Sequence, residues 1–425
     1  MADRTVLIMR ILHTSDWHLG RTFHGIDLLD DQRQTLGQLA SIVATESVDV
    51  VVVAGDVYDR SVPSADAVRV YDEGLAAIAA AGAAIVVTSG NHDSPTRLGV
   101  GSAFAAAGGL HLRTSIDGID EPVILSDEHG DVAFYGIPYL EPEVSRVALG
   151  VSEARRHQDV LTAAMGRVRA DLASREARSV VAAHAFVVGG EATGTERSIS
   201  VGGVETVAAD TFSGIDYVAL GHLHSPQEIT PTLRYSGSFL PYSFGERTHR
   251  KAVWLVDLGA DGVDEVRRHD LVEVRGLSSL TGTLDELLTS AVHADAEEHY
   301  VEATLTDATR PVDAMRRLRD RFPHAVHVQW QRPDAVAELD YRSRVHGRSD
   351  AQILRSFITD VRDEPTAAES ALVDVALRAV VGEPEHTAGV ERTGDPERID
   401  GSQRHADMSG ESLPLFDIDG IAESA

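Results

Sequence analysis

Five short segments of the sequence place aspartate, asparagine and histidine side chains directly after apolar runs. The segments are His13–His18 (HTSDWH), Gly55–Arg60 (GDVYDR), Gly90–Asp93 (GNHD), His184 and Gly221–His224 (GHLH). The preceding runs, such as DVVVVA and AAIVVTS, are typical of strands that are buried on both faces. Ligands of open α/β folds gather at the carboxyl ends of the strands. We therefore expect the five segments to meet in one site.

Each segment alone has an ordinary structural explanation. Asp16 and His18 fit a capped turn with a surface histidine, and Asp56 fits a common strand-to-helix turn. A lone histidine such as His184 is more often a hydrogen-bonded core residue than a ligand. Together the segments supply two carboxylates, one amide and four imidazoles as potential metal ligands: Asp16, His18, Asp56, Asn91, His184, His222 and His224. The combination, rather than any one member, indicates a metal site.

This mixed set of nitrogen and oxygen ligands suits phosphoester hydrolysis. A phosphodiester is anionic and repels a nucleophile, and two cations about 3.5–4 Å apart can clamp its oxygens and lower the pKa of a bound water. One carboxylate must bridge the two cations, and Asp56 is our candidate. The set suits manganese, iron or zinc better than magnesium alone. An imidazole titrates in the range that a general acid needs, so His92 is the candidate proton donor.

The composition excludes several classes of site. The chain has no cysteine, which excludes disulfides, a thiol nucleophile and zinc sites built on thiolates. No apolar run approaches the roughly 18 residues of a membrane span, and the N-terminus lacks a signal-peptide pattern, so we expect a cytoplasmic protein. The net charge is −29, whereas a nucleic-acid binder usually has a basic surface. Bound cations and a basic partner would have to offset this charge on DNA.

The order of apolar runs predicts a layered α/β domain over residues 9–260. Expected strands are 10–14, 49–54, 84–89, 131–137, 179–183, 217–220 and 252–257, and expected helices are 28–46, 65–81 and 152–173. A second small α/β unit is predicted at 265–340, with strands at 271–275, 300–305 and 325–331 and helices at 283–292 and 312–321. Two helices follow at 349–361, with Ser349 as N-cap, and at 366–381. Residues 383–425 are predicted to be a disordered acidic tail.

In this order, the five segments resemble the calcineurin-like metallophosphoesterase superfamily. HTSDWHLG, GDVYDR, GNHDS, His184 and GHLH more closely resemble the SbcD family, the nuclease subunits of bacterial SbcCD complexes. The resemblance implies a layered β-sandwich flanked by helices, a capping domain at 265–340 that contacts DNA, and C-terminal helices at 349–382. It also implies manganese-dependent cleavage of DNA, exonucleolytic on duplex ends and endonucleolytic at hairpins, in repair, recombination and replication. The implied assembly is a homodimer within a heterotetramer with an SbcC-like coiled-coil ATPase.

The same resemblance assigns roles to individual residues. One metal would be held by Asp16, His18, Asp56 and His224, and the second by Asp56, Asn91, His184 and His222. His92 would be the acid at the scissile phosphate, and the helices at 349–382 would dock the coiled coil of the partner. Archaeal and eukaryotic relatives have a further active-site histidine where this chain has Asp59, so no role for Asp59 is implied.

Three arginines are candidates for substrate binding. Arg21, Arg60 and Arg97 lie in or beside the motif loops, where they could contact DNA phosphates or pair with the many carboxylates.

Two alternative functions fit the same motifs. They are another calcineurin-like phosphatase or phosphodiesterase, and a DNA-end-binding scaffold without activity. The capping domain and C-terminal helices argue against a phosphatase, and the intact ligand set argues against a scaffold. The helices at 349–382 also fit a simple packed surface pair.

Overall fold

The structure is a computed structural model that describes residues 8–191, 206–331, 347–362 and 364–381. The chain divides into two compact units, residues 1–339 and 340–425. The tail predicted at 383–425 lies outside the described residues. Within the described residues, no helix combines the length and apolar character that a membrane crossing needs.

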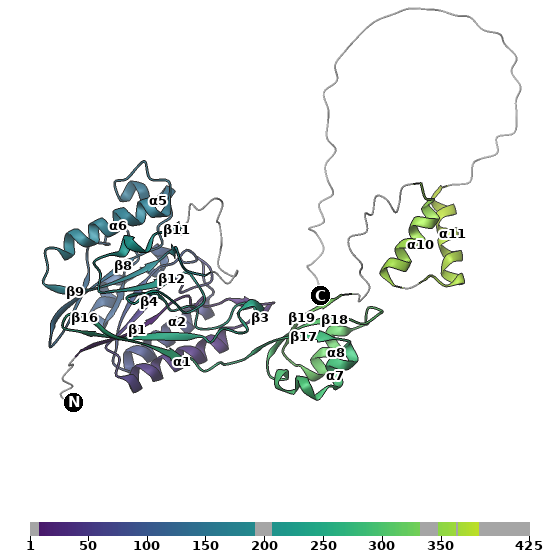
Figure 1. The fold of residues 1–425 in the computed structure, drawn as a ribbon, viewed down its shortest axis with the longest axis horizontal. Helices are drawn as coiled ribbons and strands as arrows, with labels where there is room; N and C mark the ends of the chain where they lie inside the picture. The colour runs from purple at the N-terminus through teal and green to yellow at the C-terminus, as the bar shows by residue number, and fades with distance from the viewer. Residues whose placement is uncertain (1–7, 192–205, 332–346, 363, 382–425) are drawn as a thin grey trace, which may run out of the picture. The chain divides into compact units, whose positions relative to one another are not determined.

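Two six-stranded sheets form the centre of the first unit (Figure 1). The first sheet has the order β16 (Gly262–Asp270), β15 (Ala252–Gly259), β1 (Met9–Thr14), β4 (Val50–Ala54), β5 (Ala84–Thr88) and β6 (Leu110–Leu112). The second has the order β13 (Gln227–Thr230), β14 (Leu233–Tyr235), β12 (Tyr217–Gly221), β9 (Ala177–His184), β8 (Gly130–Ile137) and β7 (Val123–Asp127). Strands β1, β4 and β5 are parallel to one another, as are β9 and β12. Their carboxyl ends therefore lie at one edge of each sheet.

Alternate residues of the central strands pack into different cores. Val50 and Val52 of β4 belong to the cluster between the sheets, which also contains Val180 of β9. Val51 and Val53 point the other way, into the cluster with helices α1 (Leu29–Glu46) and α2 (Ala65–Ala80). Helix α6 (His157–Leu172) covers the outer face of the second sheet in the same manner. Burial on both faces explains the unbroken apolar runs, and the predicted layered α/β sandwich is confirmed.

Short elements connect these layers and complete the first domain. They are β2 (Thr22–Phe23), β3 (Ile26–Asp27), α3 (Pro95–Leu98), α4 (Ser102–Ala105), α5 (Pro142–Ala148), β10 (Phe186–Val187) and β11 (Thr206–Val207). Helix α6 begins at His157 rather than at the predicted residue 152. At its first turn, the Asp159 carboxylate accepts hydrogen bonds from the backbone amide and the guanidinium of Arg156, a pair that apolar periodicity does not reveal.

The predicted boundary between the two α/β domains needs correction. Residues 262–270 form β16, which pairs antiparallel with β15 and extends the first sheet beyond residue 260. The strand predicted at 271–275 is wrong, because those residues form no strand and the next one is β17 (Leu277–Gly282). The alternating segment LVEVR suggested a strand, whereas the actual strand LSSLTG is too polar to stand out.

The second α/β domain is a three-stranded parallel sheet with helices. It contains β17, α7 (Leu284–Thr289), β18 (Tyr300–Leu305), α8 (Ala314–Arg321) and β19 (Ala325–Trp330), with the order β17-β18-β19. Thr283 caps α7 in a capping box with Glu286. Leu287, Val301 and Phe322 are fully buried in its own core, so this domain has an independent hydrophobic centre.

The described residues of the second unit form the helices α10 (Asp350–Val361) and α11 (Ala367–Val381). The predicted N-cap is confirmed, because the Ser349 side chain accepts a hydrogen bond from the Gln352 amide. Apolar side chains on both helices are exposed: Leu354, Phe357, Val361, Leu372 and Val375.

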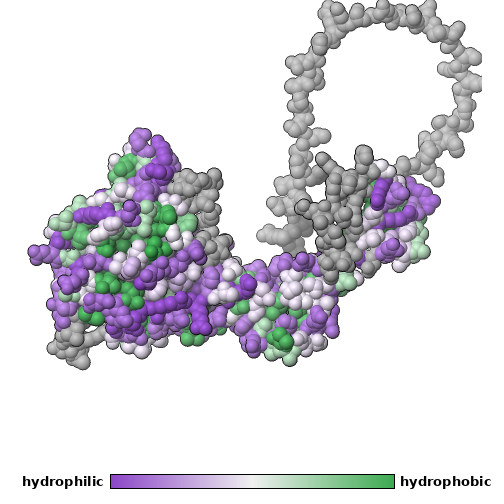
Figure 2. All heavy atoms as spheres, viewed as in Figure 1, coloured by the Kyte–Doolittle hydropathy of each residue, from purple (hydrophilic) through white to green (hydrophobic). Residues whose placement is uncertain are grey.

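The surface of the described residues is mainly hydrophilic in the view of Figure 2, with smaller apolar patches.

Candidate metal centre

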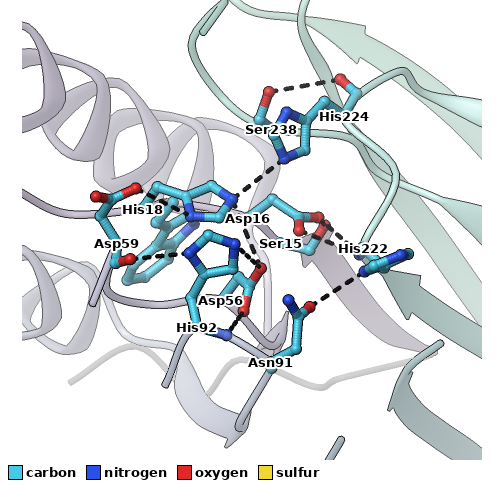
Figure 3. Close-up of polar contacts among 12 residues, drawn as sticks. Ser15, Asp16, His18, Asp56, Asp59, Asn91, His92, His222, His224 and Ser238 are labelled. Atoms are coloured by element: carbon cyan, nitrogen blue, oxygen red, sulfur yellow. Dashed lines mark hydrogen bonds and ion pairs between the residues drawn. The ribbon is translucent and has the colours of Figure 1, made fainter. Parts of the chain in front are cut away.

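The five segments from the sequence meet at the carboxyl ends of β1, β4, β5, β9 and β12. Figure 3 shows labelled residues of four of them, all except His184. The amide oxygen of Asn91 lies 2.9 Å from Nε2 of His184 and 3.2 Å from Nδ1 of His222. On the other side, Nε2 of His18 lies 3.2 Å from Nε2 of His224. The segments therefore form two neighbouring groups of potential ligand atoms.

Asp56 lies between these two groups. Its Oδ2 is 3.6 Å from Nε2 of His18 and 3.5 Å from Nε2 of His184. Its Oδ1 accepts a hydrogen bond of 2.8 Å from the backbone amide of His92, which fixes the orientation of the carboxylate. Asp16 completes the arrangement, since both its oxygens lie 3.1 Å from the backbone amide of His222. Asp56 thus has the central position expected of a bridging ligand.

Left-handed backbone conformations aim several of these side chains inward. Asp16, His18 and Asp56 have φ values of 52°, 44° and 49°, and His222 has a φ of 110°. Such conformations cost about 1–3 kcal/mol each for residues with a side chain, and they gather at functional sites. Backbone hydrogen bonds of 3.0 Å from Asp16 to the Gly55 carbonyl and from His18 to the Asp56 carbonyl hold the loops together. The strain is therefore maintained by pairing of the β1 and β4 loops.

Two motif glycines are needed because side chains of the site approach their backbone. A Cβ on Gly90 would lie 2.1 Å from Oδ1 of Asp56 and 2.4 Å from its backbone nitrogen. A Cβ on Gly221 would lie 1.9 Å from the carbonyl oxygen of Ala54 and 2.9 Å from Nδ1 of His184. The glycines of GNHD and GHLH thus make room for the carboxylate and imidazole next to them.

Burial keeps the imidazoles of His18 and His184 neutral. The pKa values of His18 and His184 lie well below the ordinary value because both rings are removed from solvent, and neighbouring histidines lower them further. The site's aspartates and His224 are almost fully buried, and His222 is 8% exposed. A neutral imidazole offers the lone pair that a metal ion requires.

The donor atoms fit divalent cations. Among the described residues, ligand atoms lie within 4.8 Å of one another in three groups: Asp16, His18 and His224; Asp16, Asp56 and His184; and His18, Asp59 and His92. Nδ1 of His18 is buried without a hydrogen-bond partner. Several carboxylate, amide and imidazole atoms thus converge in a buried space, and mixed oxygen and nitrogen sets of this kind bind first-row divalent metals.

His92 lies at the rim of this cluster. Its Nδ1 is 2.8 Å from the carbonyl oxygen of Asp59, which can only accept, so Nδ1 carries the proton. Its Nε2 is 4.0 Å from Oδ2 of Asp56 and is the ring atom that faces the cluster. The ring is 7% exposed and packs edge-on against His18. A backbone carbonyl thus sets the tautomer and orientation of His92.

Residues 9–226 match the calcineurin-like phosphoesterase family. This match covers about half of the chain and includes all five segments. The chain belongs to the calcineurin-like phosphoesterase family. Residues 267–362 of this phosphoesterase match a second family, the SbcD C-terminal domain, described as the type 5 capsule protein repressor C-terminal domain.

One relative of the phosphoesterase agrees with these two matches. The SbcD subunit of the SbcCD nuclease from Staphylococcus epidermidis is 27% identical over 361 residues, which cover 84% of this chain and 94% of that protein. The resemblance to the SbcD family is confirmed, and the chain is a metal-binding hydrolase of phosphoester bonds. Among solved structures, a protein from Thermus thermophilus (12% identity, TM-score 0.38) covers 61% of this chain and 99% of its own. A dimetal phosphatase from Danio rerio (14% identity, TM-score 0.39) covers 62% and 97%.

The three arginines of the sequence analysis occupy different environments in the phosphoesterase. The Arg21 guanidinium lies 3.5 Å from Oδ1 of Asp59 and 4.9 Å from the centre of the Tyr242 ring. Arg60 is largely exposed, with Nε 3.7 Å from the other oxygen of Asp59. Arg97 donates to the Ser61 carbonyl at 3.1 Å. Asp59 therefore joins two arginines to the histidine cluster, since its Oδ1 is also 3.8 Å from Nδ1 of His18.

Sequence reasoning assigned no role to three buried charged residues of the site. Asp93 accepts hydrogen bonds from the backbone amides of Val57, Tyr58 and Gly90, and thereby ties the second segment to the third. Burial raises the pKa of the Asp93 carboxyl, although these amides oppose the rise. Glu246 and Lys251 pair beneath His224. Asp93 stands inside the GNHD motif, and Glu246 ends the segment YSGSFLPYSFGE, which also resembles the family, whereas nothing in the local pattern marks Lys251.

Proposed function

We propose that the chain is the metal-dependent DNA nuclease subunit of an SbcCD-type complex. The observation that carries the proposal is the convergence of six other ligand-type side chains around Asp56. The proposed activities are exonucleolytic cleavage of duplex ends and endonucleolytic cleavage of hairpins and single strands, in DNA repair, recombination and replication. The Staphylococcus epidermidis relative, named as a nuclease subunit, supports this substrate class because the match extends over nearly its whole length.

Two ligand sets follow from the two groups of atoms around Asp56. Asp16, His18, Asp56 and His224 would hold one divalent cation, and Asp56, Asn91, His184 and His222 would hold the other. The position of Asp56 within 3.6 Å of His18 and 3.5 Å of His184 supports its shared role. When bound, the cations would polarise the phosphate and lower the pKa of a water molecule. We propose Mn²⁺, because the set mixes imidazole with oxygen ligands.

In this function, His92 donates a proton to the leaving oxygen from Nε2. The hydrogen bond between Nδ1 and the Asp59 carbonyl keeps the ring oriented, so Nε2 is the atom presented to a substrate. Arg21 and Arg60 would hold flanking phosphates, with Asp59 orienting both guanidinium groups. Arg97 would contribute from the α3 loop. Asp59 then links substrate binding, through its carboxylate, to the orientation of His92, through its backbone carbonyl.

The remaining parts of the chain suit an assembly. The exposed apolar side chains of α10 and α11 support docking of the coiled coil of an SbcC-like ATPase on residues 349–382. The α/β domain that ends near residue 330 would contact DNA as a capping domain. Exposed apolar residues around α2 to α4, namely Val62, Val68, Val100 and Phe104, support a homodimer within a heterotetramer. A cytoplasmic location remains a prediction.

A two-substrate assay tests the proposed function. Purified protein would be given linear duplex DNA or p-nitrophenyl phosphate, with and without Mn²⁺, as wild type and as Asp56→Asn. We expect Mn²⁺-dependent degradation of DNA, little hydrolysis of the aryl phosphate, and loss of DNA cleavage in Asp56→Asn with DNA binding largely kept. Asp127→Asn, which alters a buried ion pair of the second sheet, is the control. A preference for the aryl phosphate would favour the phosphatase, and activity in neither assay would favour the scaffold.

A further inference from the structure

A buried ion pair lies directly behind His224. Glu246 ends the short 3₁₀ helix η3 (Phe244–Glu246) and is fully buried, and Lys251 precedes β15 and is 7% exposed. Nζ of Lys251 is 2.5 Å from Oε2 of Glu246 and donates to the carbonyl of His224 at 2.8 Å and to Oγ of Ser238 at 2.9 Å. Three acceptors thus use the three protons of the ammonium group, and the pair is clamped to the backbone of His224.

Stability alone does not explain a charged pair at this position. Removing two charges from water costs several kcal/mol per ion, and apolar pairs of similar volume are often as stable or more stable. The geometry offers another explanation. The second carboxylate oxygen, Oε1 of Glu246, lies 3.7 Å from Nδ1 of His224. The opposite ring nitrogen of His224, Nε2, faces Nε2 of His18 at 3.2 Å. Glu246 therefore lies at the outer nitrogen of an imidazole whose inner nitrogen faces the cluster.

We propose that Glu246, held by Lys251, is a positioning residue that accepts a hydrogen bond from Nδ1 of His224 and turns the unprotonated Nε2 toward one cation position. The inference rests on the metal-binding role of His224 in the proposed function. Metal-binding histidines commonly donate their outer N–H to a carboxylate, which fixes the tautomer and raises the basicity of the ligand nitrogen. The 3.7 Å between Oε1 of Glu246 and Nδ1 of His224 is close to the roughly 2.7–3.2 Å of a hydrogen bond, so the carboxylate is in place to accept from this nitrogen.

The charge compensation around Glu246 is consistent with this role. Nζ of Lys251 lies 2.5 Å from Oε2 of Glu246, and both side chains are buried. Lys251 supplies the compensating charge, which lets the carboxylate stay ionised next to His224 without contact with solvent.

The second cation position has a different support. Nδ1 of His184 lies 3.0 Å from the carbonyl oxygen of Ala54, a neutral acceptor fixed within β4. The tautomer of His184 is therefore set by a backbone carbonyl of the sheet rather than by a side chain. Loss of Glu246 should accordingly weaken the cation position next to His18 and His224 and leave the position next to His184 and Asn91 unchanged. This asymmetry separates positioning of one ligand from general loosening of the site.

Two double variants test the inference by metal binding rather than by activity. Both carry Lys251→Met, so that no unpaired ammonium group remains buried. Glu246→Gln keeps an acceptor oxygen for Nδ1, and Glu246→Leu removes it at similar volume. Calorimetric titration with Mn²⁺ gives the affinity of each site, and electron paramagnetic resonance distinguishes a coupled pair of Mn²⁺ ions from a single ion. Asp127→Leu with Arg178→Met is the matched control, because it removes another buried ion pair at the opposite end of β9 from His184.

We expect wild type and control to bind two Mn²⁺ ions with similar affinities. In the Glu246→Leu variant one site weakens by about 10–100-fold and the other changes less than twofold, and the Glu246→Gln variant lies between. Equal weakening of both sites, no weakening, or equal effects of Gln and Leu would overturn the inference. If the Glu246→Leu variant does not fold, the isosteric Glu246→Gln variant is compared with wild type and the control instead. If the wild-type protein binds no Mn²⁺, the proposed function fails. If it binds two Mn²⁺ ions and the Glu246 substitutions change neither affinity, only the positioning role is refuted.

Discussion

The imidazole rings of His18 and His224 face each other with 3.2 Å between their Nε2 atoms, although 206 positions separate them in the chain. Both rings are almost completely buried, and burial lowers the pKa of His18 far below its ordinary value. Two imidazole nitrogens at this distance share a proton or coordinate a cation. With Asp16 and Asp56 beside them, coordination is the role that we assign.

The proton-donor role of His92 predicts a substrate-dependent loss of activity. General acid catalysis contributes about 10²–10⁴-fold, and it matters only where the leaving oxygen needs a proton. His92→Ala should therefore lose activity of this order on duplex DNA but far less on a nucleotide p-nitrophenyl ester, whose phenolate leaves unprotonated. Steady-state rates on both substrates, with Mn²⁺ affinity as the control, decide the matter. Equal losses on the two substrates would show that His92 acts in some other way.

Gly90→Ala should damage both the metal centre and the fold. The added methyl group would lie 2.1 Å from Oδ1 and 2.4 Å from the backbone nitrogen of Asp56, so the backbone must shift. We expect about 1–3 kcal/mol of lost unfolding free energy and loss of Mn²⁺ binding, measured by urea denaturation and calorimetry. Gly166→Ala in α6 is the control, because open space surrounds that position and alanine favours a helix by about 0.5–1 kcal/mol. Unchanged Mn²⁺ binding in Gly90→Ala would contradict this packing argument.

His13 predicts a pH dependence of stability that is independent of the metal centre. Its ring bonds to the Tyr217 hydroxyl at 3.0 Å and the Leu220 carbonyl at 3.1 Å, and burial lowers its pKa to about 3 from 6.5. Below pH 6.5 this histidine binds a proton in the unfolded chain but not in the folded chain. The free energy of unfolding therefore falls from pH 6.5 down to about pH 3. One histidine contributes a slope of about 1.4 kcal/mol per pH unit there.

A variant isolates this contribution. His13→Gln should show a shallower decline of unfolding free energy below about pH 6.5, measured by urea denaturation with chelator present. Stability near pH 8 serves as the reference for each protein. Parallel pH profiles of wild type and His13→Gln between about pH 6.5 and 4.5 would refute the assignment to His13.

Docking of an SbcC-like coiled coil on α10 and α11 predicts sensitive apolar positions. Phe357 and Leu372 are 52% and 67% exposed, which suits anchors that become buried in a complex. Phe357→Asp and Leu372→Asp should each weaken binding of the purified partner by at least tenfold, since buried interface anchors contribute about 2 kcal/mol or more. Val292→Asp is the control because Val292 is exposed in the other unit. Wild-type affinity in both helix variants would show that the partner docks on another surface.

Much of the catalytic domain was predictable because its strands are buried on both faces. Runs such as VVVVA at β4 and SVVAAH at β9 identify strands, and the polar residue that follows each run then marks the edge where ligands meet. The polar edge strand β16, GVDEVRRHD, has no comparable signal, which explains the misplaced domain boundary. Likewise, β17 has too few apolar residues to be distinguished from a loop.

Other features of the site depend on contacts that no local pattern encodes. The left-handed backbone at Asp16 and Asp56 exists because the loops after β1 and β4 bond to each other. Glu246 and Lys251 reach His224 only after the segment between β14 and β15 packs beneath it. The chemistry of the ligands was therefore visible in the sequence, whereas the residues that orient them required the fold.

The central claim is that two cations share Asp56 as a ligand. Crystals grown with Mn²⁺ and measured at the manganese absorption edge would locate the ions by anomalous scattering. We expect two peaks, one coordinated by Asp16, His18 and His224 and the other by Asn91, His184 and His222, with Asp56 bound to both. A single ion, or two ions of which one is not bound by Asp56, would contradict the account.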